Sequence, residues 1–261
     1  MNLTKNFTPE ERQRYARQLV IPEIGLNGQI KLGNTTALIV GCGGLGASCA
    51  MYLAAAGVGR IGLADHDTIS LSNLSRQVAY STAEIGTVKV TALKRRLLAI
   101  NPNITVDAYE TSLTFENAEQ LAAPYQMIID GTDNLSTRFL INDLCVLTRK
   151  PFIHGAVQQF YGQAAVFDAS RGACYRCIYP EPVPQVIPQK GIVGPVAGMI
   201  GMVQAIQAIL LILGIGSPLV SQMLLFDALK SNINIINLKK NPECKVCGSK
   251  PEITHLKGEV S

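Results

Sequence analysis

Residues 41–46 read Gly-Cys-Gly-Gly-Leu-Gly, a spacing typical of loops that bind nucleotide phosphates. The loop follows an apolar, β-rich run at 35–40 that we expect to be a strand, and it precedes a predicted helix at 47–56. Glycines let the backbone approach a phosphate, which the N–H groups and the dipole at a helix N-terminus attract. This context predicts a nucleotide site. The alternative is a glycine turn that only packs the helix against the strand.

A carboxylate and two cations follow the glycine loop. Asp65 lies 24 residues after Gly41, at the end of a second expected strand at 60–64, where it can accept hydrogen bonds from ribose hydroxyls. The loop and this carboxylate do not by themselves distinguish a redox dinucleotide from ATP. Arg76 and Lys89 favour ATP, because attack on its α-phosphate needs cations that neutralise developing charge and hydride transfer does not. Ordinary surface cations are the alternative.

Asp133 stands just past the fourth expected strand, at 126–130, which follows a third at 104–109. Ligands collect at the carboxyl ends of strands in open α/β sheets, and a carboxylate there can hold Mg²⁺. Asp133 can also cap the helix that we expect to begin at Leu135, and the two roles are compatible.

Four of the seven cysteines form two Cys-x-x-Cys pairs, Cys174 with Cys177 and Cys244 with Cys247. The two pairs are separated by 66 intervening residues and are therefore not one local zinc finger. Together they predict a tetrahedral, structural zinc that fixes the tail to the body.

The remaining thiols and the histidines carry no recognisable catalytic motif. Cys42, Cys49 and Cys145 lie in apolar contexts, so we expect small core residues rather than nucleophiles. None of the three histidines, including His154 in an expected strand, comes with a motif that would make it a catalytic base.

The order of the expected elements predicts the fold class. Strands alternate with helices from 35 to 157, which predicts a parallel sheet. The next strand, at 162–167, follows 152–157 too closely for a crossover helix and must be antiparallel to it, and two more strands are expected near 223–226 and 233–238. We therefore expect an α/β fold: a Rossmann-like, mixed, mainly parallel sheet with helices on both faces, C-terminal antiparallel strands and a zinc-pinned tail.

Length and composition set the domain organisation. With 48% hydrophobic and 16% charged residues among 261, the chain can bury a sizeable core and is not disordered. We expect a helical segment over 1–30, a nucleotide-binding domain over 31–250 with a proline-rich loop at 179–195, and a tail over 251–261; the family resemblance described below implies that the middle domain is an adenylation domain.

Composition also excludes some partners and compartments. A net charge of +4 without a run of lysines and arginines argues against nucleic acid. The stretch 192–216 is long enough to cross a bilayer, but its two glutamines, five glycines and proline favour a buried core helix over membrane insertion. The N-terminus lacks the apolar core of a secretory signal, so we expect a cytoplasmic protein.

Six motifs occur in the order of one known family. They are RYARQ from Arg14, GCGGLG from Gly41, DHDTISLSNLSRQ from Asp65, Lys89, GTDN from Gly131, and the pair CYRC and CKVC. From Arg14 to Cys247 the chain resembles the ThiF/MoeB/HesA adenylyltransferases, bacterial relatives of ubiquitin-activating enzymes.

The resemblance implies a homodimer whose subunits bind ATP and Mg²⁺ and adenylate the C-terminal glycine of a small ubiquitin-like sulfur-carrier protein, releasing pyrophosphate. It implies that Arg17 reaches the triphosphate of the partner subunit and that the four paired cysteines bind zinc. Arg17, Arg76, Lys89 and Asp133 would be catalytic. The implied nucleotide contacts are Gly41, Gly43, Gly44, Asp65, Ser72, Asn73, Leu74, Ser75, Arg76, Lys89, Asp133 and Asn134.

One position departs from the family pattern. Several members carry a cysteine for covalent sulfur chemistry four residues before the first glycine of a G-x-x-G-P segment, and counting back from Gly191 gives Ile187. This favours the molybdopterin-synthase-activating type, for which adenylation suffices, with sulfur supplied by a separate donor protein because no fused sulfurtransferase domain is expected. The alternatives are a thiazole (thiamine) pathway adenylyltransferase, a catalytically silent nucleotide-binding partner protein and a nicotinamide dehydrogenase.

Overall fold

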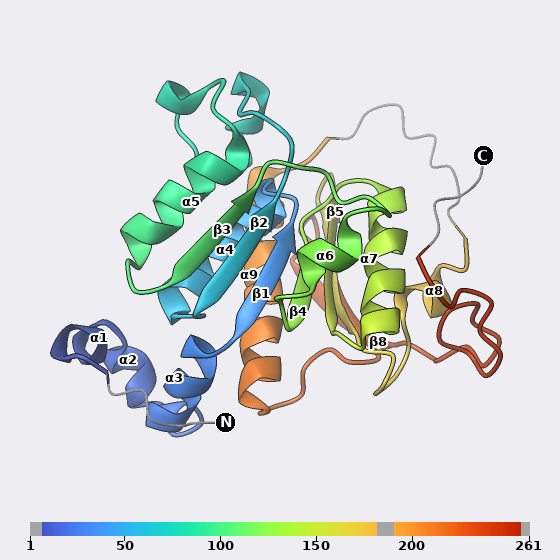
Figure 1. The fold of residues 1–261 in the computed structure, drawn as a ribbon. Helices are drawn as coiled ribbons and strands as arrows, with labels where there is room; N and C mark the ends of the chain where they lie inside the picture. The colour runs from blue at the N-terminus through green and yellow to red at the C-terminus, as the bar shows by residue number, and fades with distance from the viewer. Residues whose placement is uncertain (1–6, 182–190, 257–261) are drawn as a thin grey trace.

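One mixed eight-stranded sheet organises the chain (Figure 1), and the computed structural model describes residues 7–181 and 191–256. The strand order is β3-β2-β1-β4-β5-β6-β7-β8. The strands are β1 (Thr36–Val40), β2 (Arg60–Ala64), β3 (Thr105–Tyr109), β4 (Met127–Asp130), β5 (Phe152–Gln158), β6 (Tyr161–Phe167), β7 (Gln222–Asp227) and β8 (Asn232–Asn237).

The sheet has a parallel half and an antiparallel half. Strands β3, β2, β1, β4 and β5 pair in parallel, whereas β6, β7 and β8 each pair antiparallel with the strand before. The predicted mixed sheet, with its change of direction after β5, is therefore confirmed.

Helices cover both faces of the sheet. Along β1, Ala37 and Ile39 belong to the core cluster shared with α4, α5 and α9, and Leu38 and Val40 belong to the cluster shared with α6 and α7. This alternation buries β1 on both sides, as expected for a central parallel strand. The helices are α1 (Pro9–Arg14), α2 (Ala16–Leu19), α3 (Gly25–Gly33), α4 (Gly44–Ala56), α5 (Lys89–Ile100), α6 (Ala118–Ala122), α7 (Leu135–Thr148), α8 (Tyr175–Ile178) and α9 (Gly194–Leu213), with 3₁₀ turns η1 (Leu71–Asn73) and η2 (Thr82–Glu84).

Two helix boundaries differ from the predicted ones. Helix α4 begins at Gly44 rather than at residue 47, so the end of the glycine loop forms the first helical turn. Helix α9 is shorter than the apolar stretch 192–216, because Pro195 lies in its first turn and Gly214 adopts a left-handed φ of 70° that ends it. Most of the proline-rich loop, including Ile187, lies outside the described residues.

Helix α9 is the one helix in the described ranges that is long and apolar enough to cross a membrane. Half of its most hydrophobic window is buried against the rest of the chain. It packs against α4, β5 and β6, and Gln204 on its inner side is fully buried. In this structure α9 is therefore a core helix, as its two glutamines predicted.

Close contact between α4 and α9 depends on a glycine. A Cβ built on Gly201 would lie 2.4 Å from the carbonyl oxygen of Leu45 in α4, which no side chain can tolerate without movement of the backbone. Gly198, one turn earlier on α9, has open space, since the nearest atom to its Cβ position is the Ser48 hydroxyl oxygen at 4.0 Å.

Substituting the two glycines should therefore change stability in opposite directions. Gly201→Ala should lower the free energy of unfolding by about 1–3 kcal/mol through overpacking. Gly198→Ala should raise it by about 0.5–1 kcal/mol, because alanine restricts the unfolded chain more than glycine does. Urea denaturation followed by circular dichroism measures both values. Equal effects of the two substitutions would contradict the close α4–α9 contact.

Candidate active site

The glycine loop is held by contacts between backbones. Gly41 has a left-handed φ of 90°. A Cβ on Gly46 would lie 1.8 Å from the carbonyl oxygen of Gly41, and a Cβ on Gly131 would lie 2.3 Å from the same atom. In the part of the chain that the structure describes, no side chain caps α4 at Gly43. The N–H groups of the first turn of α4 therefore remain available to an anion.

A cleft of about 700 Å³ opens beside this loop, along the carboxyl ends of the parallel strands and the start of β6. Of the predicted nucleotide contacts, nine line it: Gly41, Gly43, Gly44, Asp65, Asn73, Arg76, Lys89, Asp133 and Asn134. The cleft is large enough for a nucleotide and part of a second substrate. Four predicted residues, all among those described, lie outside its wall: Arg17, Ser72, Leu74 and Ser75.

Asp65 supports the turn on which the phosphate site is built. One carboxylate oxygen accepts a hydrogen bond from the backbone N–H of Cys42 at 2.7 Å, and the other accepts one from Asp67 at 2.8 Å. The side chain therefore joins the end of β2 to the glycine loop and lies at the cleft.

Lys89 is a buried cation with its own counter-ion. Its Nζ lies 2.7 Å from a carboxylate oxygen of Asp67, and its side chain is only 5% exposed. The hydrogen bond from Lys89 lowers the pKa of Asp67, so this carboxylate is ionised at neutral pH. Asp67 therefore fixes the position of the buried Lys89 side chain at the cleft, and the spacing of residues in the sequence did not predict this role.

The start of α7 corrects one prediction. The residue that caps this helix is Asn134, whose side-chain oxygen accepts a hydrogen bond from the N–H of Thr137 at 2.8 Å. Asp133, for which capping was the alternative role, is therefore not the cap; it precedes Asn134 and lies exposed at the cleft. An N-cap needs extended backbone and a short polar side chain, and Asn134, directly before the first helical residue, has both.

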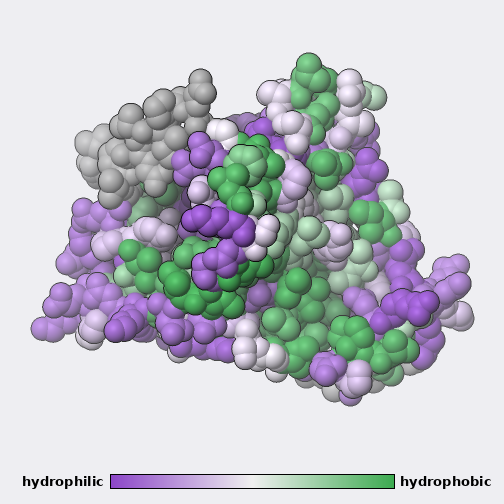
Figure 2. All heavy atoms as spheres, turned by 180° about the vertical axis from the view of Figure 1, so that it is seen from behind, coloured by the Kyte–Doolittle hydropathy of each residue, from purple (hydrophilic) through white to green (hydrophobic). Residues whose placement is uncertain are grey.

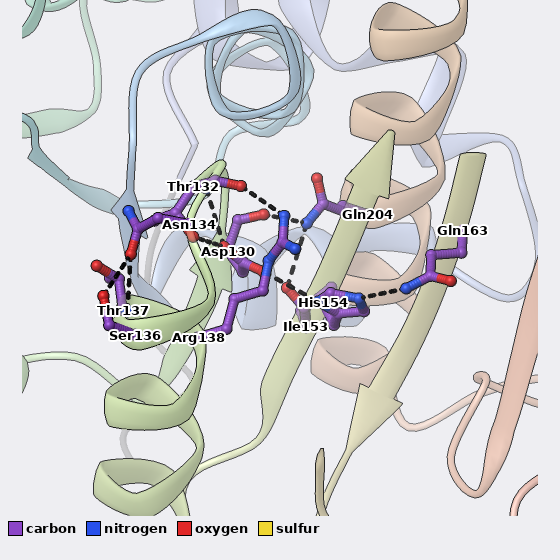
Figure 3. A network of polar contacts seen from close by, with 10 residues as sticks. All are labelled: Asp130, Thr132, Asn134, Ser136, Thr137, Arg138, Ile153, His154, Gln163 and Gln204. Atoms are coloured by element: carbon purple, nitrogen blue, oxygen red, sulfur yellow. Dashed lines mark hydrogen bonds and ion pairs between the residues drawn. The ribbon is translucent and has the colours of Figure 1, made fainter. Parts of the chain in front are cut away.

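Below the cleft lies a buried carboxylate with four hydrogen-bond donors (Figure 3). One oxygen of Asp130 accepts from the backbone N–H and the hydroxyl of Thr132, at 2.9 and 2.6 Å. The other accepts from Arg138 Nε at 3.2 Å and from His154 Nδ1 at 2.9 Å. Burial alone would raise the pKa of Asp130, but Arg138 and His154 outweigh it and lower the pKa, so the carboxylate is charged.

This network fixes the backbone on which Asp133 is carried. Besides contacting Asp130, Arg138 donates from Nη2 to the carbonyl oxygen of Thr132 at 2.8 Å. Gln204 on α9 donates to the carbonyl oxygens of Asp130 and Ile153, at 2.7 and 3.2 Å. The loop between β4 and α7 is thus held from α7, β5 and α9.

Sequence reasoning did not assign these supporting residues to the site. Asp130 could have been recognised from the sequence, because it is a carboxylate at the end of an otherwise apolar strand. His154 was expected to be structural, and it is fully buried. Burial lowers its pKa despite the adjacent Asp130, so the imidazole is neutral. Arg138 and Gln163, which both line the cleft, gave no local signal.

The three cysteines outside the pairs are buried, as predicted. Burial raises the pKa of the Cys42, Cys49 and Cys145 thiols. They are therefore protonated at neutral pH, and none is an activated nucleophile.

The paired cysteines converge on one point beside α8. The Sγ–Sγ distances are 3.8 Å for Cys174–Cys177, 3.5 Å for Cys174–Cys244 and 3.4 Å for Cys177–Cys247. All four sulfur atoms lie within 4.8 Å of one another. Tetrahedral thiolates around zinc are about 3.8 Å apart, given a Zn–S bond of about 2.3 Å. The donor set and its spacing fit such a metal.

The sequence pattern that defines the ThiF family matches residues 15–246. The chain belongs to the ThiF family. Among curated relatives, it is 42% identical over 254 residues to a sulfur carrier protein adenylyltransferase of Thermus thermophilus, with 94% of each chain covered. It is 41% identical to adenylyltransferase and sulfurtransferase MOCS3 of Anopheles gambiae, covering 98% of this chain and 59% of that protein. This ThiF-family chain is an adenylyltransferase.

Solved structures of the same fold include MccB from E. coli. The structure titled as MccB with MccA-N7isoASN aligns with a TM-score of 0.82 at 23% identity, covering 94% of this chain and 76% of that one. The structure titled as MccB with ATP aligns with a TM-score of 0.76 at 26% identity, covering 90% and 74%. This ThiF-family chain and MccB therefore have the same fold.

Acid should destabilise this protein through His154. An unfolded histidine titrates near about 6.5, and folded His154 has a lower pKa, so between the two values the unfolded chain binds more protons. The free energy of unfolding should fall as pH drops from 7.5 to 5.5, by up to about 1.4 kcal/mol for each pH unit. Urea denaturation at several pH values gives the free energy of unfolding as a function of pH. This free energy should depend less steeply on pH in His154→Gln than in the wild type.

The exposed His66 supplies the control. His66→Gln removes an imidazole whose side chain is 68% exposed, so its effect on the free energy of unfolding at pH 7.5 should stay within about 0.5 kcal/mol. Parallel stability profiles of wild type and His154→Gln over this range would contradict the buried neutral imidazole.

Proposed function

We propose that the protein catalyses ATP-dependent adenylation of the C-terminal glycine of a small ubiquitin-like sulfur-carrier protein. The observation that carries the proposal is the convergence of the glycine loop, Asp65, Arg76, Lys89 and Asp133 on one cleft. Two relatives support it: the Thermus thermophilus protein is a sulfur carrier protein adenylyltransferase by name, and MccB of the same fold is known with ATP.

In this proposal each group has a distinct task. The N-terminus of α4 and the glycine loop receive the phosphates, and Asp65 accepts hydrogen bonds from the ribose. A carrier carboxylate oxygen attacks the α-phosphorus, and the bond from that phosphorus to the bridging oxygen breaks as pyrophosphate leaves. The nucleophile is already ionised and needs no base, so positioning and charge neutralisation by Arg76 and Lys89 supply most of the rate.

Asp133 offers an exposed carboxylate at the cleft, which is the kind of ligand that Mg²⁺ takes beside phosphate oxygens. Bound there, Mg²⁺ would neutralise phosphate charge. Asp133 also stands where it can orient the adenylate, and the Asp130 network holds its backbone in place for either task.

We place the reaction in the molybdopterin pathway, with sulfur delivered by a separate donor protein, and in the cytoplasm. Residue 187 is an isoleucine, and the cysteines outside the two pairs are buried thiols, so no described thiol is suited to a covalent bond with the carrier. A reducing compartment keeps four cysteine thiolates available for a metal.

Carrier-dependent exchange of pyrophosphate into ATP tests the reaction. Arg76→Ala, Lys89→Ala and Asp133→Ala should each lower the exchange rate roughly a hundredfold, since removal of one transition-state interaction costs on the order of 3 kcal/mol. Arg95 on α5, which is 62% exposed and outside the cleft, is the matched control, and Arg95→Ala should exchange at the wild-type rate. An exchange rate in Asp133→Ala equal to that of the wild type would contradict the proposed role of this carboxylate.

We further propose a homodimer in which Arg17 completes the partner's site. Arg17 is exposed on α2 and does not line the cleft of its own chain. Apolar side chains gather on the face that α4 and α9 cover (Figure 2), where Tyr52, Met202 and Ile206 are 54%, 36% and 54% exposed. Such a surface is typical of a protein interface.

Subunit complementation tests this arrangement. Arg17→Ala and Asp133→Ala homodimers should both be inactive, and mixing them should restore about a quarter of wild-type exchange, because half the dimers are mixed and each mixed dimer has one intact site. Mass spectrometry of the mixture confirms that subunits exchange. Exchanged subunits without recovered activity would place Arg17 in its own chain's site or outside the reaction.

Zinc at the four paired cysteines is the third part of the proposal, and there it would fix the C-terminal segment to α8. Elemental analysis should find about one zinc per chain. Cys244→Ser should lower the melting temperature more than it changes ATP affinity, because none of the four cysteines lines the cleft. Cys49→Ala, which removes a buried thiol outside the cluster, should keep the zinc. A stable, metal-free preparation would contradict the assignment.

A further inference from the structure

Gln163 links the cleft to the buried network beneath it. It lies on β6 opposite Ala156 of β5, and it lines the cleft together with Arg138, Tyr175 and Tyr179. Its Nε2 atom is 3.1 Å from Nε2 of His154 (Figure 3). This contact joins a half-buried amide at the cleft to a fully buried imidazole.

The surroundings of His154 determine which atom donates in that contact. The charged or titratable groups that face it are Asp130 on β4, Arg138 on α7 and Tyr175 on α8, and Phe152 and Phe167 pack around the ring.

The charged Asp130 can only accept, so His154 must donate from Nδ1. In a neutral imidazole the other nitrogen is then an acceptor. The amide of Gln163 must therefore donate from Nε2, and its oxygen must point away from the ring, as Figure 3 shows. Within the described ranges, that oxygen accepts no hydrogen bond, and Gln163 is one of the residues that line the cleft.

Position along the sheet indicates what this oxygen meets. Asp65 directly follows β2, and Gln163 lies on β6; the two strands are four strand spacings apart, or about 19 Å. Asp133 follows β4, between them. A nucleoside held at Asp65 therefore lies far from Gln163, and the acyl substrate must approach Asp133 from the side of Gln163.

We propose that Gln163 accepts a hydrogen bond from a backbone N–H of the carrier's extended C-terminal peptide, and that His154 is the positioning residue that keeps the Gln163 oxygen turned toward it. The inference rests on the proposed function, because it takes the acyl substrate to be a peptide. An extended peptide offers an N–H group at every residue except proline, and a fixed acceptor selects its register.

The tautomer of His154 can be tested without any substrate. The chain has three histidines, so ¹⁵N spectra of the imidazoles are simple, and His66→Gln and His255→Gln assign the remaining signal to His154. We expect the neutral Nδ1–H form at pH 7.5. An Nε2–H tautomer or an imidazolium there would overturn the proposal, because Gln163 would then have to present its NH₂ group to the cleft.

Kinetics test the contact itself. The probe is a ubiquitin-like protein ending in Gly-Gly that supports exchange by the wild-type enzyme. Gln163→Leu should raise the KM for this carrier at least about tenfold and leave the KM for ATP unchanged, because only the carrier loses a partner. Gln222→Leu, the same substitution on the neighbouring strand β7 and outside the cleft, should leave both values unchanged.

Backbone substitution in the carrier separates binding from a structural defect. Semisynthetic carriers in which one of the last two peptide bonds is an ester lack a single N–H group. One of them should raise the wild-type KM about as much as Gln163→Leu does, and the variant should show no further loss with it. Equal losses in wild type and variant, or no loss in either, would overturn the contact.

Failure of the proposed function and failure of the Gln163 contact give different results. Absence of exchange by wild type with every such carrier would overturn the proposed function and the role of Gln163 with it. Exchange by wild type with an unchanged carrier KM in Gln163→Leu would overturn the inference alone.

Discussion

The candidate site depends on a single backbone oxygen that two other segments approach closely. Gly46 in the first turn of α4 and Gly131 after β4 both lie so near the carbonyl of Gly41 that neither can carry a side chain. This contact sets the distance between the phosphate loop and the loop that carries Asp133. Hydrogen bonds elsewhere in the cleft can be rearranged by small side-chain movements, whereas this contact can change only if the backbones separate.

Charge in the cleft is organised as pairs of unequal exposure. Lys89 is buried beside the half-exposed Asp67, and the buried Asp130 is compensated by Arg138 at the edge of the cleft. In each pair, one side chain is almost fully buried and the other is more exposed to solvent. The buried side chains, Lys89 and Asp130, are already ordered before a substrate binds. Substrate binding therefore loses little conformational entropy at these residues.

Local patterns in the sequence predicted most of the fold and the glycine loop. Apolar periodicity located all eight strands within about two residues, and the short connection after β5 predicted the change to antiparallel pairing. The choice of Asn134 over Asp133 as the cap was not predictable, since both are good capping residues and backbone angles decide between them. Arg138, His154 and Gln163 come from three elements that meet only in the folded sheet, so no spacing along the chain could group them.

The cysteine cluster has a consequence for the chain while it is being synthesised. Cys174 and Cys244 are 70 residues apart, and helix α9 and strands β7 and β8 lie between them. At translation rates of about 5–20 residues per second, the first pair waits on the order of ten seconds for the second. During that interval β6 is an uncovered edge strand and the half-site is two unprotected thiols. Synthesis therefore leaves an unpaired β6 edge and two unprotected thiols exposed at the same time, and the second cysteine pair is made only after β7, the strand that covers that edge.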